Sequence, residues 1–155
     1  MWKAFQRYRA LDPLSRSLFR QAVLLLPTIA ISLRFRGFKS TKEALQKDLS
    51  VLSPAQSPGE TTMIALQKTS RMVLAAAHHG LIHPTCLAES LALWYLLQKQ
   101  RVPASLRIGV RKVSEKFEAH AWVEHDGTAL NQPDQHHQHY AAFDSGFSDL
   151  PEEKP

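Results

Sequence analysis

The sequence has a single cysteine, Cys86, in 155 residues. One cysteine excludes an internal disulfide framework and a cysteine-rich zinc site. It is compatible with a reducing cytoplasm, where we expect the protein to reside.

The chain also lacks a long uninterrupted apolar run. The run "AVLLLPTIAISL" is twelve residues long, is broken by Pro27 and is followed by Arg34. A membrane-spanning helix needs about 20 residues, and no small-residue cleavage site follows the run. We therefore expect a buried helix here, with attachment to a membrane surface as a minor alternative.

Acidic residues are scarce in the first third of the chain. Residues 1–47 contain ten Lys or Arg against Asp12 and Glu43, a net charge of +8, whereas the segment from Asp134 onward has five acids and one lysine, −4. A basic region attracts acidic peptides, nucleic acids or lipid surfaces, although it can also be a solvated helix face. No alternation of aromatic and basic residues accompanies this charge, so no nucleic-acid partner is expected.

The basic region has helical signals. Asp12 followed by Pro13 predicts a helix start, with aspartate as the N-cap and proline at the first helical position. This helix should reach about Pro27, bend or restart there, and end at Gly37.

Two further helices are predicted on either side of a linker. Ser40 and Glu43 form a capping-box pattern for a helix over residues 40–49. Residues 51–59 contain two prolines and a glycine and predict a linker. Residues 60–80 predict the next helix, and its expected core positions are Met63, Ile64, Leu66, Met72 and Val73.

Beyond these helices the pattern changes from helix to strand. The segment from Cys86 to Arg101 has a broad apolar face and predicts a central, mostly buried helix. Residues 102–113 alternate between apolar and polar or small side chains, as a strand does. Residues 117–131 predict a hairpin around the turn Asp126-Gly127. The order predicts an α+β fold.

We accordingly expect four regions along the chain. They are a basic helical N-terminal region (1–50), a linker (51–59), a core domain that contains the single cysteine and the predicted strands (60–144) and an acidic tail (145–155). The single cysteine begins the third region's central helix.

Cys86 and His120 are the residues that suggest catalysis. A cysteine in the first turn of a helix lies near the positive end of the helix dipole, which favours the nucleophilic thiolate. A histidine can pair with that thiolate and later protonate a leaving amine. By the two-residue period of a strand, His120 shares a face with Trp122 and Glu124. Taken singly, each residue could instead be an ordinary buried cysteine or a core histidine.

A third residue should orient the imidazole. With the turn centred between residues 126 and 127, the antiparallel partner of His120 falls near residue 133. Asp134 is one step beyond that position and Asn131 is two steps before it. Asp126 is about 20 Å along the strand and is expected to serve the turn. Asp134 is therefore favoured, with Asn131 second.

Three sequence blocks together resemble a known family. The blocks "CLAESLALWYLL", "ASLRIGVRK" and "FEAHAWVEHDG" are similar, in order and spacing, to the transglutaminase-like cysteine peptidase domain of lasso peptide biosynthesis, the B protein. The resemblance covers about residues 83–134. It implies a transglutaminase-like or papain-like core, in which a central cysteine-bearing helix packs on an antiparallel sheet.

The resemblance also implies an activity. Proteins of this family remove the leader from a ribosomally made precursor peptide, and a separate ATP-dependent cyclase then closes the freed core. Carried over, Cys86 is the nucleophile, His120 is the base and acid, and an acid such as Asp134 follows. The first 50 residues read as helices rather than as the winged-helix leader-binding domain that some members carry. The chain therefore resembles the split form, which needs a separate recognition protein.

Other functions compete with this interpretation. The same cysteine–histidine chemistry serves acyl and amide transfer, because the thioester intermediate is common and only the acceptor differs. A non-catalytic scaffold is a third class. His136, His137 and His139 could bind a metal with Asp134, but they lack the fixed spacing of zinc hydrolases, so no metal or other cofactor is expected.

Overall fold

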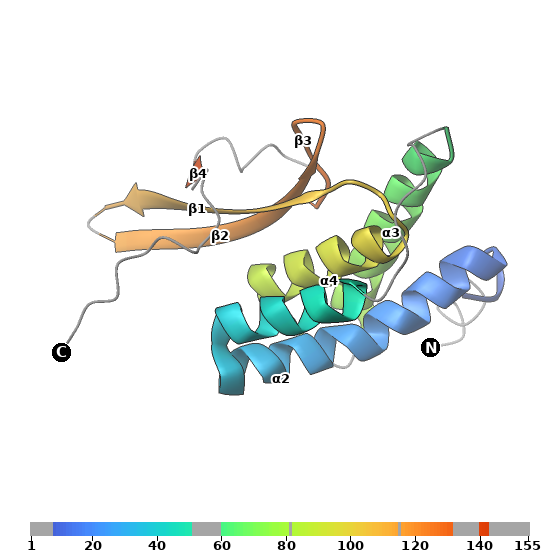
Figure 1. Cartoon of the computed structure of the whole chain (residues 1–155), viewed down its shortest axis with the longest axis horizontal. Coiled ribbons are helices and arrows are strands. Elements are labelled where there is room, and N and C mark those ends of the chain that lie inside the picture. The colour runs from blue at the N-terminus through green and yellow to red at the C-terminus, as the bar shows by residue number, and fades with distance from the viewer. Residues whose placement is uncertain (1–7, 51–59, 81, 115, 132–139, 143–155) are drawn as a thin grey trace.

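The computed structural model describes residues 8–50, 60–80, 82–114, 116–131 and 140–142. Three helices come first and strands follow, which confirms the predicted order of an α+β chain. The elements are α2 (Pro13–Ser50), α3 (Glu60–His79), α4 (Cys86–Lys99), β1 (Ser105–Val113), β2 (Lys116–His125), β3 (Thr128–Ala129) and β4 (Ala141–Ala142). The antiparallel sheet has the order β3-β2-β1-β4. Figure 1 shows the helices on one side of this sheet, with α4 next to it.

The start of α2 is as predicted. The helix begins at Pro13, and the Asp12 carboxylate accepts hydrogen bonds from the Ser15 backbone N–H at 3.3 Å and from the Ser15 hydroxyl at 2.7 Å. Lys68 of α3 also donates to Asp12, at 2.9 Å. These three contacts hold the pKa of Asp12 well below its ordinary value. The capping residue therefore also joins α2 to α3.

The predicted restart of the helix at Pro27 is wrong, because the helix continues through that residue. The predicted end at Gly37 corresponds to a kink, since Gly37 has a φ of 74° and a ψ of 178°, which are not helical. Proline removes one helical hydrogen bond, but Leu26 and Ile29 on either side of it are buried at 2% and 1% exposure. Their packing into the core accompanies the continuation of the helix past Pro27.

The predicted capping box at Ser40 and Glu43 is also wrong. Helical structure resumes directly after Gly37, so Ser40 already lies inside the helix. The Thr41 hydroxyl donates to the Gly37 carbonyl at 2.7 Å and lies 2.9 Å from the Ser32 hydroxyl across the kink. These bonds, together with the left-handed glycine, stabilise the kink without a separate N-cap.

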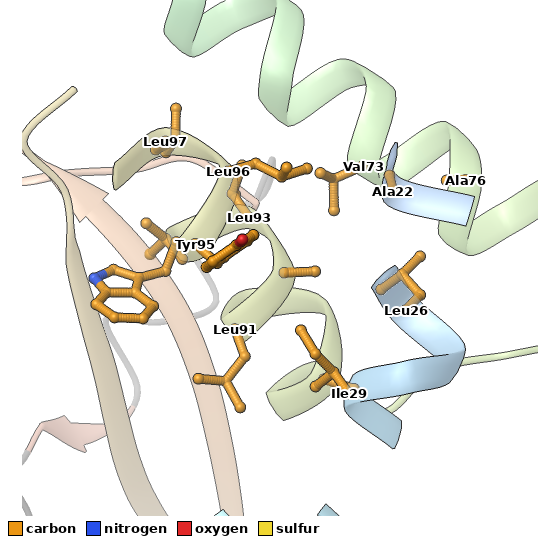
Figure 2. Close-up of a cluster of buried hydrophobic side chains, with 14 of the residues drawn as sticks. Ala22, Leu26, Ile29, Val73, Ala76, Leu91, Leu93, Tyr95, Leu96 and Leu97 are labelled. Atoms are coloured by element: carbon orange, nitrogen blue, oxygen red, sulfur yellow. The ribbon is translucent and has the colours of Figure 1, made fainter. Parts of the chain in front are cut away.

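One core joins the three helices. Every residue from Ser90 to Leu97 is buried, which confirms the predicted central, mostly buried helix. Leu26 and Ile29 of α2 and Val73 of α3 pack against it, and Figure 2 shows their side chains meeting those of α4.

The predicted core face of α3 is correct in part. Leu66, Met72 and Val73 are buried at 4% exposure or less, whereas Met63 and Ile64 are 55% and 50% exposed. The first turn of α3 extends past the helices that bury its later turns, so its apolar side chains remain in solvent.

The sheet contains two hairpins. β1 pairs with β2, with Gly109 opposite His120, and β2 pairs with β3, with Glu124 opposite Ala129. The second pairing confirms the predicted turn: Asp126 and Gly127 both have positive φ, 46° and 74°, as a two-residue type I′ turn requires. The strand predicted over residues 102–113 begins at Ser105.

The two faces of the sheet have different partners. Val123 and Leu106 face the helices and pack into their core. His120 and Trp122 lie on the opposite face, because side chains alternate along a strand. The imidazole is therefore carried on the face turned away from the helical layer.

α2 is long and apolar enough to cross a membrane by length and composition alone. Core helices of soluble proteins pass the same test, and Leu18, Ala22, Leu26 and Ile29 of α2 are buried against other parts of the chain. The expected buried helix is therefore correct in part, because Leu24 and Ile31 of the same apolar run are 73% and 60% exposed. The predicted linker (51–59) and acidic tail (145–155) lie outside the described residues.

Candidate active site

Cys86 is the first residue of α4. Thr85 is the N-cap, and its hydroxyl accepts a hydrogen bond from the Ala88 N–H at 3.3 Å. The thiol-bearing residue is half-buried and free of any disulfide. Cys86 therefore lies at the positive end of a capped helix, where negative charge is stabilised.

Ser90 connects this helix end to strand β2. It follows Cys86 by four residues, about one helical turn or 6 Å, so the two side chains share one side of α4. The fully buried Ser90 hydroxyl donates to the carbonyl of Ala121 at 2.9 Å. Ala121 is the immediate neighbour of His120 in β2.

Ser90 bonds to the edge of β2 that points away from β1. The Val123 N–H and C=O bond to Asn131 and Leu130, so both point away from β1. In an antiparallel strand this direction recurs every second residue, and the Ala121 carbonyl therefore points to the same outer edge. The N-terminal half of α4 thus lies beside the outer edge of β2, next to the position that carries His120.

Asn131 completes the junction between the start of α4 and the outer edge of β2, the α4–β2 junction. It is 4% exposed, and its side-chain carbonyl accepts from the Val123 N–H at 3.0 Å. Its amide nitrogen donates to the Ser90 hydroxyl at 3.0 Å and to a Glu89 carboxylate oxygen at 3.3 Å. Both amide protons and the carbonyl are thus engaged in joining α4 to β2.

Glu89 lies in the first turn of α4, between Cys86 and Ser90. Burial raises the pKa of its carboxyl, and the hydrogen bond from Asn131 and the charge of His78 oppose that rise. No local sequence pattern marks Glu89 as part of the site.

His120 is enclosed by aromatic rings. Its ring centroid lies 6.2 Å from that of Trp122, with the planes 19° apart, and 5.2 Å from that of Tyr140. Trp122 is 2% exposed. Such packing restricts the imidazole to few orientations.

Gly109, opposite His120, makes this enclosure possible. A Cβ at this position would lie 2.9 Å from Trp122 Cη2, 2.9 Å from Tyr140 Cβ and 3.0 Å from the Ala141 carbonyl oxygen. These separations are too short for any side chain without movement of the neighbours. Glycine therefore allows Trp122 and β4 to close over the strand beside His120.

Ion pairs flank the aromatic group on the same sheet face. Trp122 Nε1 donates to Glu124 at 2.7 Å, and Glu124 pairs with Arg107 at 3.0 Å. Arg111 lies 4.7 Å above the Tyr140 ring. These contacts fix the indole and the tyrosine, which in turn border His120.

The three candidates for the orienting residue have different positions. Asp134, the favoured candidate, lies outside the described residues. Asn131 is buried in the α4–β2 junction, with its amide engaged as above. Asp126 is in the turn, with its side chain 90% exposed and 3.3 Å from His125 Nε2, which agrees with the prediction that it serves the turn.

The contacts on which the junction depends were mostly missed in the sequence. Ser90 belongs to the cysteine block of the sequence, but no role was derived for it. A serine in an otherwise apolar helix, four residues after the cysteine, was the available signal.

No cluster of three or more metal-binding side chains occurs among the described residues. The proposed metal ligands Asp134, His136, His137 and His139 lie outside that part of the chain.

Comparisons with known proteins identify the family. Residues 23–144 match the model of the transglutaminase-like superfamily, so the chain belongs to that superfamily. Searches of curated proteins and of solved structures found no match. Membership supports a cysteine-dependent protease or transferase chemistry. The match starts within α2, which agrees with the packing of that helix into the core.

Proposed function

We propose that this protein is a leader peptidase that cleaves a ribosomally made lasso precursor peptide. The observation that carries the proposal is the position of Cys86 at the capped start of α4, whose next turn is hydrogen-bonded to β2 beside His120. Membership of the transglutaminase-like superfamily supports the chemistry. The three sequence blocks that resemble the lasso B protein support the substrate class.

The proposed reaction has two steps. The Cys86 thiolate attacks the carbonyl carbon of the bond between leader and core, and His120 gives a proton to the departing core amine. This leaves the leader bound to Cys86 as a thioester. His120 then removes a proton from water, which attacks the thioester, releases the leader carboxylate and restores the thiol. Asp134 is proposed to orient the imidazole.

The proposal includes partners. A separate recognition protein would hold the leader and raise its local concentration to about the millimolar range. A separate ATP-dependent cyclase would then use the freed core amine. We place this reaction in the cytoplasm, without a cofactor, a metal or a nucleic acid.

Substitution of the nucleophile tests the mechanism. Cys86→Ala should abolish leader cleavage, measured by mass spectrometry with precursor and recognition protein present, while its circular dichroism stays that of the wild type. Iodoacetamide should alkylate Cys86 in the folded wild type at neutral pH. Cleavage by the alanine variant would refute the mechanism, whereas a folded wild type that neither cleaves the precursor nor reacts with iodoacetamide would leave a non-catalytic scaffold as the role of the fold.

Asp134 and Asp126 form a matched pair for the third member. Asp134→Ala should reduce turnover strongly, whereas Asp126→Ala should leave turnover near that of the wild type, because the Asp126 side chain is in solvent at the turn. Equal losses in the two variants would remove Asp134 from the mechanism.

Acyl transfer is the second candidate, because the superfamily match fits it equally. The thioester would then pass to an amine instead of water. Adding a fluorescent primary amine to the cleavage reaction separates the two. Free leader carboxylate as the sole product supports hydrolysis, and a leader–amine conjugate as the main product supports transfer.

A further inference from the structure

An open groove lies between α2 and the segment that leads into α4. It has a volume of about 590 Å³, within the range of ligand clefts. α2 contributes Pro27, Ile31 and Arg34, and the other wall includes Thr85 and Leu87. The last two residues are the chain neighbours of Cys86, so the groove lies beside the start of α4.

The groove opens onto an apolar stripe of α2. Leu24, Ile31 and Phe35 are spaced by seven and four residues, which places them on one side of the helix. They are 73%, 60% and 78% exposed. Ile31 belongs to both the stripe and the groove, so apolar surface continues from the middle of α2 to the start of α4.

The charge around this surface has one sign. Arg34 and His83 line the groove, and no Asp or Glu is among its lining residues. The sequence has no acid between residues 13 and 42, where six Lys or Arg occur. Apolar surface bordered by basic side chains is complementary to a peptide in which apolar residues accompany an acidic one.

We propose that this groove binds the leader residues that immediately precede the cleaved bond, and that it selects apolar side chains accompanied by an acidic one. The inference rests on the proposed function, because it takes Cys86 as the nucleophile. In that reaction the leader is the acyl portion held on Cys86. Its last residues must therefore extend away from the thiol, and the groove borders the helix start that carries the thiol, at Thr85 and Leu87.

Peptidyl ketones that alkylate cysteine test the groove without a known precursor. The probes are two acyloxymethyl ketones with the acetylated sequences Glu-Leu-Leu-Ala and Lys-Leu-Leu-Ala. In each, the thiolate displaces the carboxylate leaving group from the ketone's methylene carbon and forms a thioether. The rate of labelling at Cys86 is measured by mass spectrometry on the full-length protein.

The wild type should react faster with the glutamate probe than with the lysine probe. Ile31→Ser should slow both probes by about ten-fold, as expected when an apolar side chain of this size loses its contact. Arg34→Glu should make the lysine probe react faster than the glutamate probe. Each rate should change by about three-fold, the size of one exposed charge contact. Phe117→Ser is the matched control, because Phe117 is 77% exposed and does not line the groove, and it should change neither rate.

Iodoacetamide distinguishes the failure of this inference from that of the proposed function. Equal iodoacetamide rates in all variants, with altered peptidyl rates only in the groove variants, support the groove. Peptidyl rates that are the same in all variants overturn it while leaving Cys86 as the nucleophile. A folded wild type whose Cys86 resists both reagents contradicts the proposed function itself.

Two other occupants of the surface would also overturn the inference. One is a second copy of the chain, shown if sedimentation velocity finds a dimer that Ile31→Ser dissociates. The other is a lipid surface, shown if the protein binds vesicles containing phosphatidylglycerol and Ile31→Ser abolishes that binding while both peptidyl rates stay unchanged.

Discussion

Replacing Asn131 with alanine should damage the fold more than the chemistry. The amide joins three groups: it accepts from the Val123 N–H and donates to the Ser90 hydroxyl and the Glu89 carboxylate. Alanine can make none of these bonds. The start of α4 and the outer edge of β2 would then lose their polar connection.

The size of the effect follows from burial. Val123 and Ser90 are both 0% exposed, so water cannot replace the lost partners. Each buried hydrogen bond contributes about 1 kcal/mol net, and an orphaned buried N–H costs about 1–3 kcal/mol. Asn131→Ala should therefore lower the free energy of unfolding by about 3–5 kcal/mol, a large part of the roughly 5–15 kcal/mol typical of a domain.

Urea unfolding followed by circular dichroism measures this loss. Ser90→Ala should lower the free energy of unfolding by about 2–3 kcal/mol, because it also removes the bond to the Ala121 carbonyl. The double variant Ser90→Ala/Asn131→Ala should be less destabilised than the sum of the two, by about 1 kcal/mol, since the two residues share a bond. Asp126→Ala, an exposed turn position, is the control, at about 1 kcal/mol.

One result would refute the reasoning. The free energy of unfolding of Asn131→Ala could lie within about 1 kcal/mol of the wild-type value while the variant has no cleavage activity. In that case the amide serves the chemistry and not the junction. Asn131 would then be the residue that orients the imidazole, and the assignment of that role to Asp134 would fail.

Three further substitutions test other contacts. Gly109→Ala should lower the free energy of unfolding by about 1–3 kcal/mol, measured in urea, because the added Cβ would lie 2.9 Å from Trp122; unchanged stability would show that the sheet yields there. Burial raises the pKa of Glu89 above its ordinary 4.5, so the folded state binds the proton more tightly than the unfolded state does. The folded state therefore loses stability as the pH rises above 4.5 through the raised pKa. Glu89→Gln should accordingly be more stable than the wild type near pH 7 and equal to it below about pH 4.5 in urea titrations, and a difference independent of pH would contradict this. Tyr95→Phe removes a hydroxyl that donates to Asp48 at 2.5 Å and should cost about 1–2 kcal/mol; as burial and Asp48 raise the pKa of Tyr95 to about 12, the absorbance titration at 295 nm should lose a step near that pH in the variant.

The position of the thiol at the start of α4 and the position of the hairpin turn could be predicted because their signals are local. Thr85 caps the helix that starts at Cys86 through a bond to Ala88, three residues away. Asp126 and Gly127 adopt the positive φ values that their turn requires, and this fixes the pairing of β2 with β3. Neighbouring residues alone determine both features, so sequence is sufficient for them.

Packing between distant segments decided the continuity of α2 and which apolar side chains are buried. Pro27 predicts a break, but burial of its neighbours against α3 and α4 keeps α2 continuous. Met63 has the same apolar character as Leu66, and only the position of the other helices buries one and exposes the other. The sequence alone does not show which surface each helix presents to its neighbours.

The junction beside the candidate active site depends on tertiary structure in the same way. Ser90 meets Ala121 and Asn131 across separations of 31 and 41 residues, and nothing in the local pattern pairs them. Sequence determined which residue begins the central helix and where the hairpin turns, because short-range hydrogen bonds and backbone conformation set both. Only the folded chain decided that the helix start lies at the edge of β2, because burial leaves Ser90 and Asn131 no water to bond and they must bond each other.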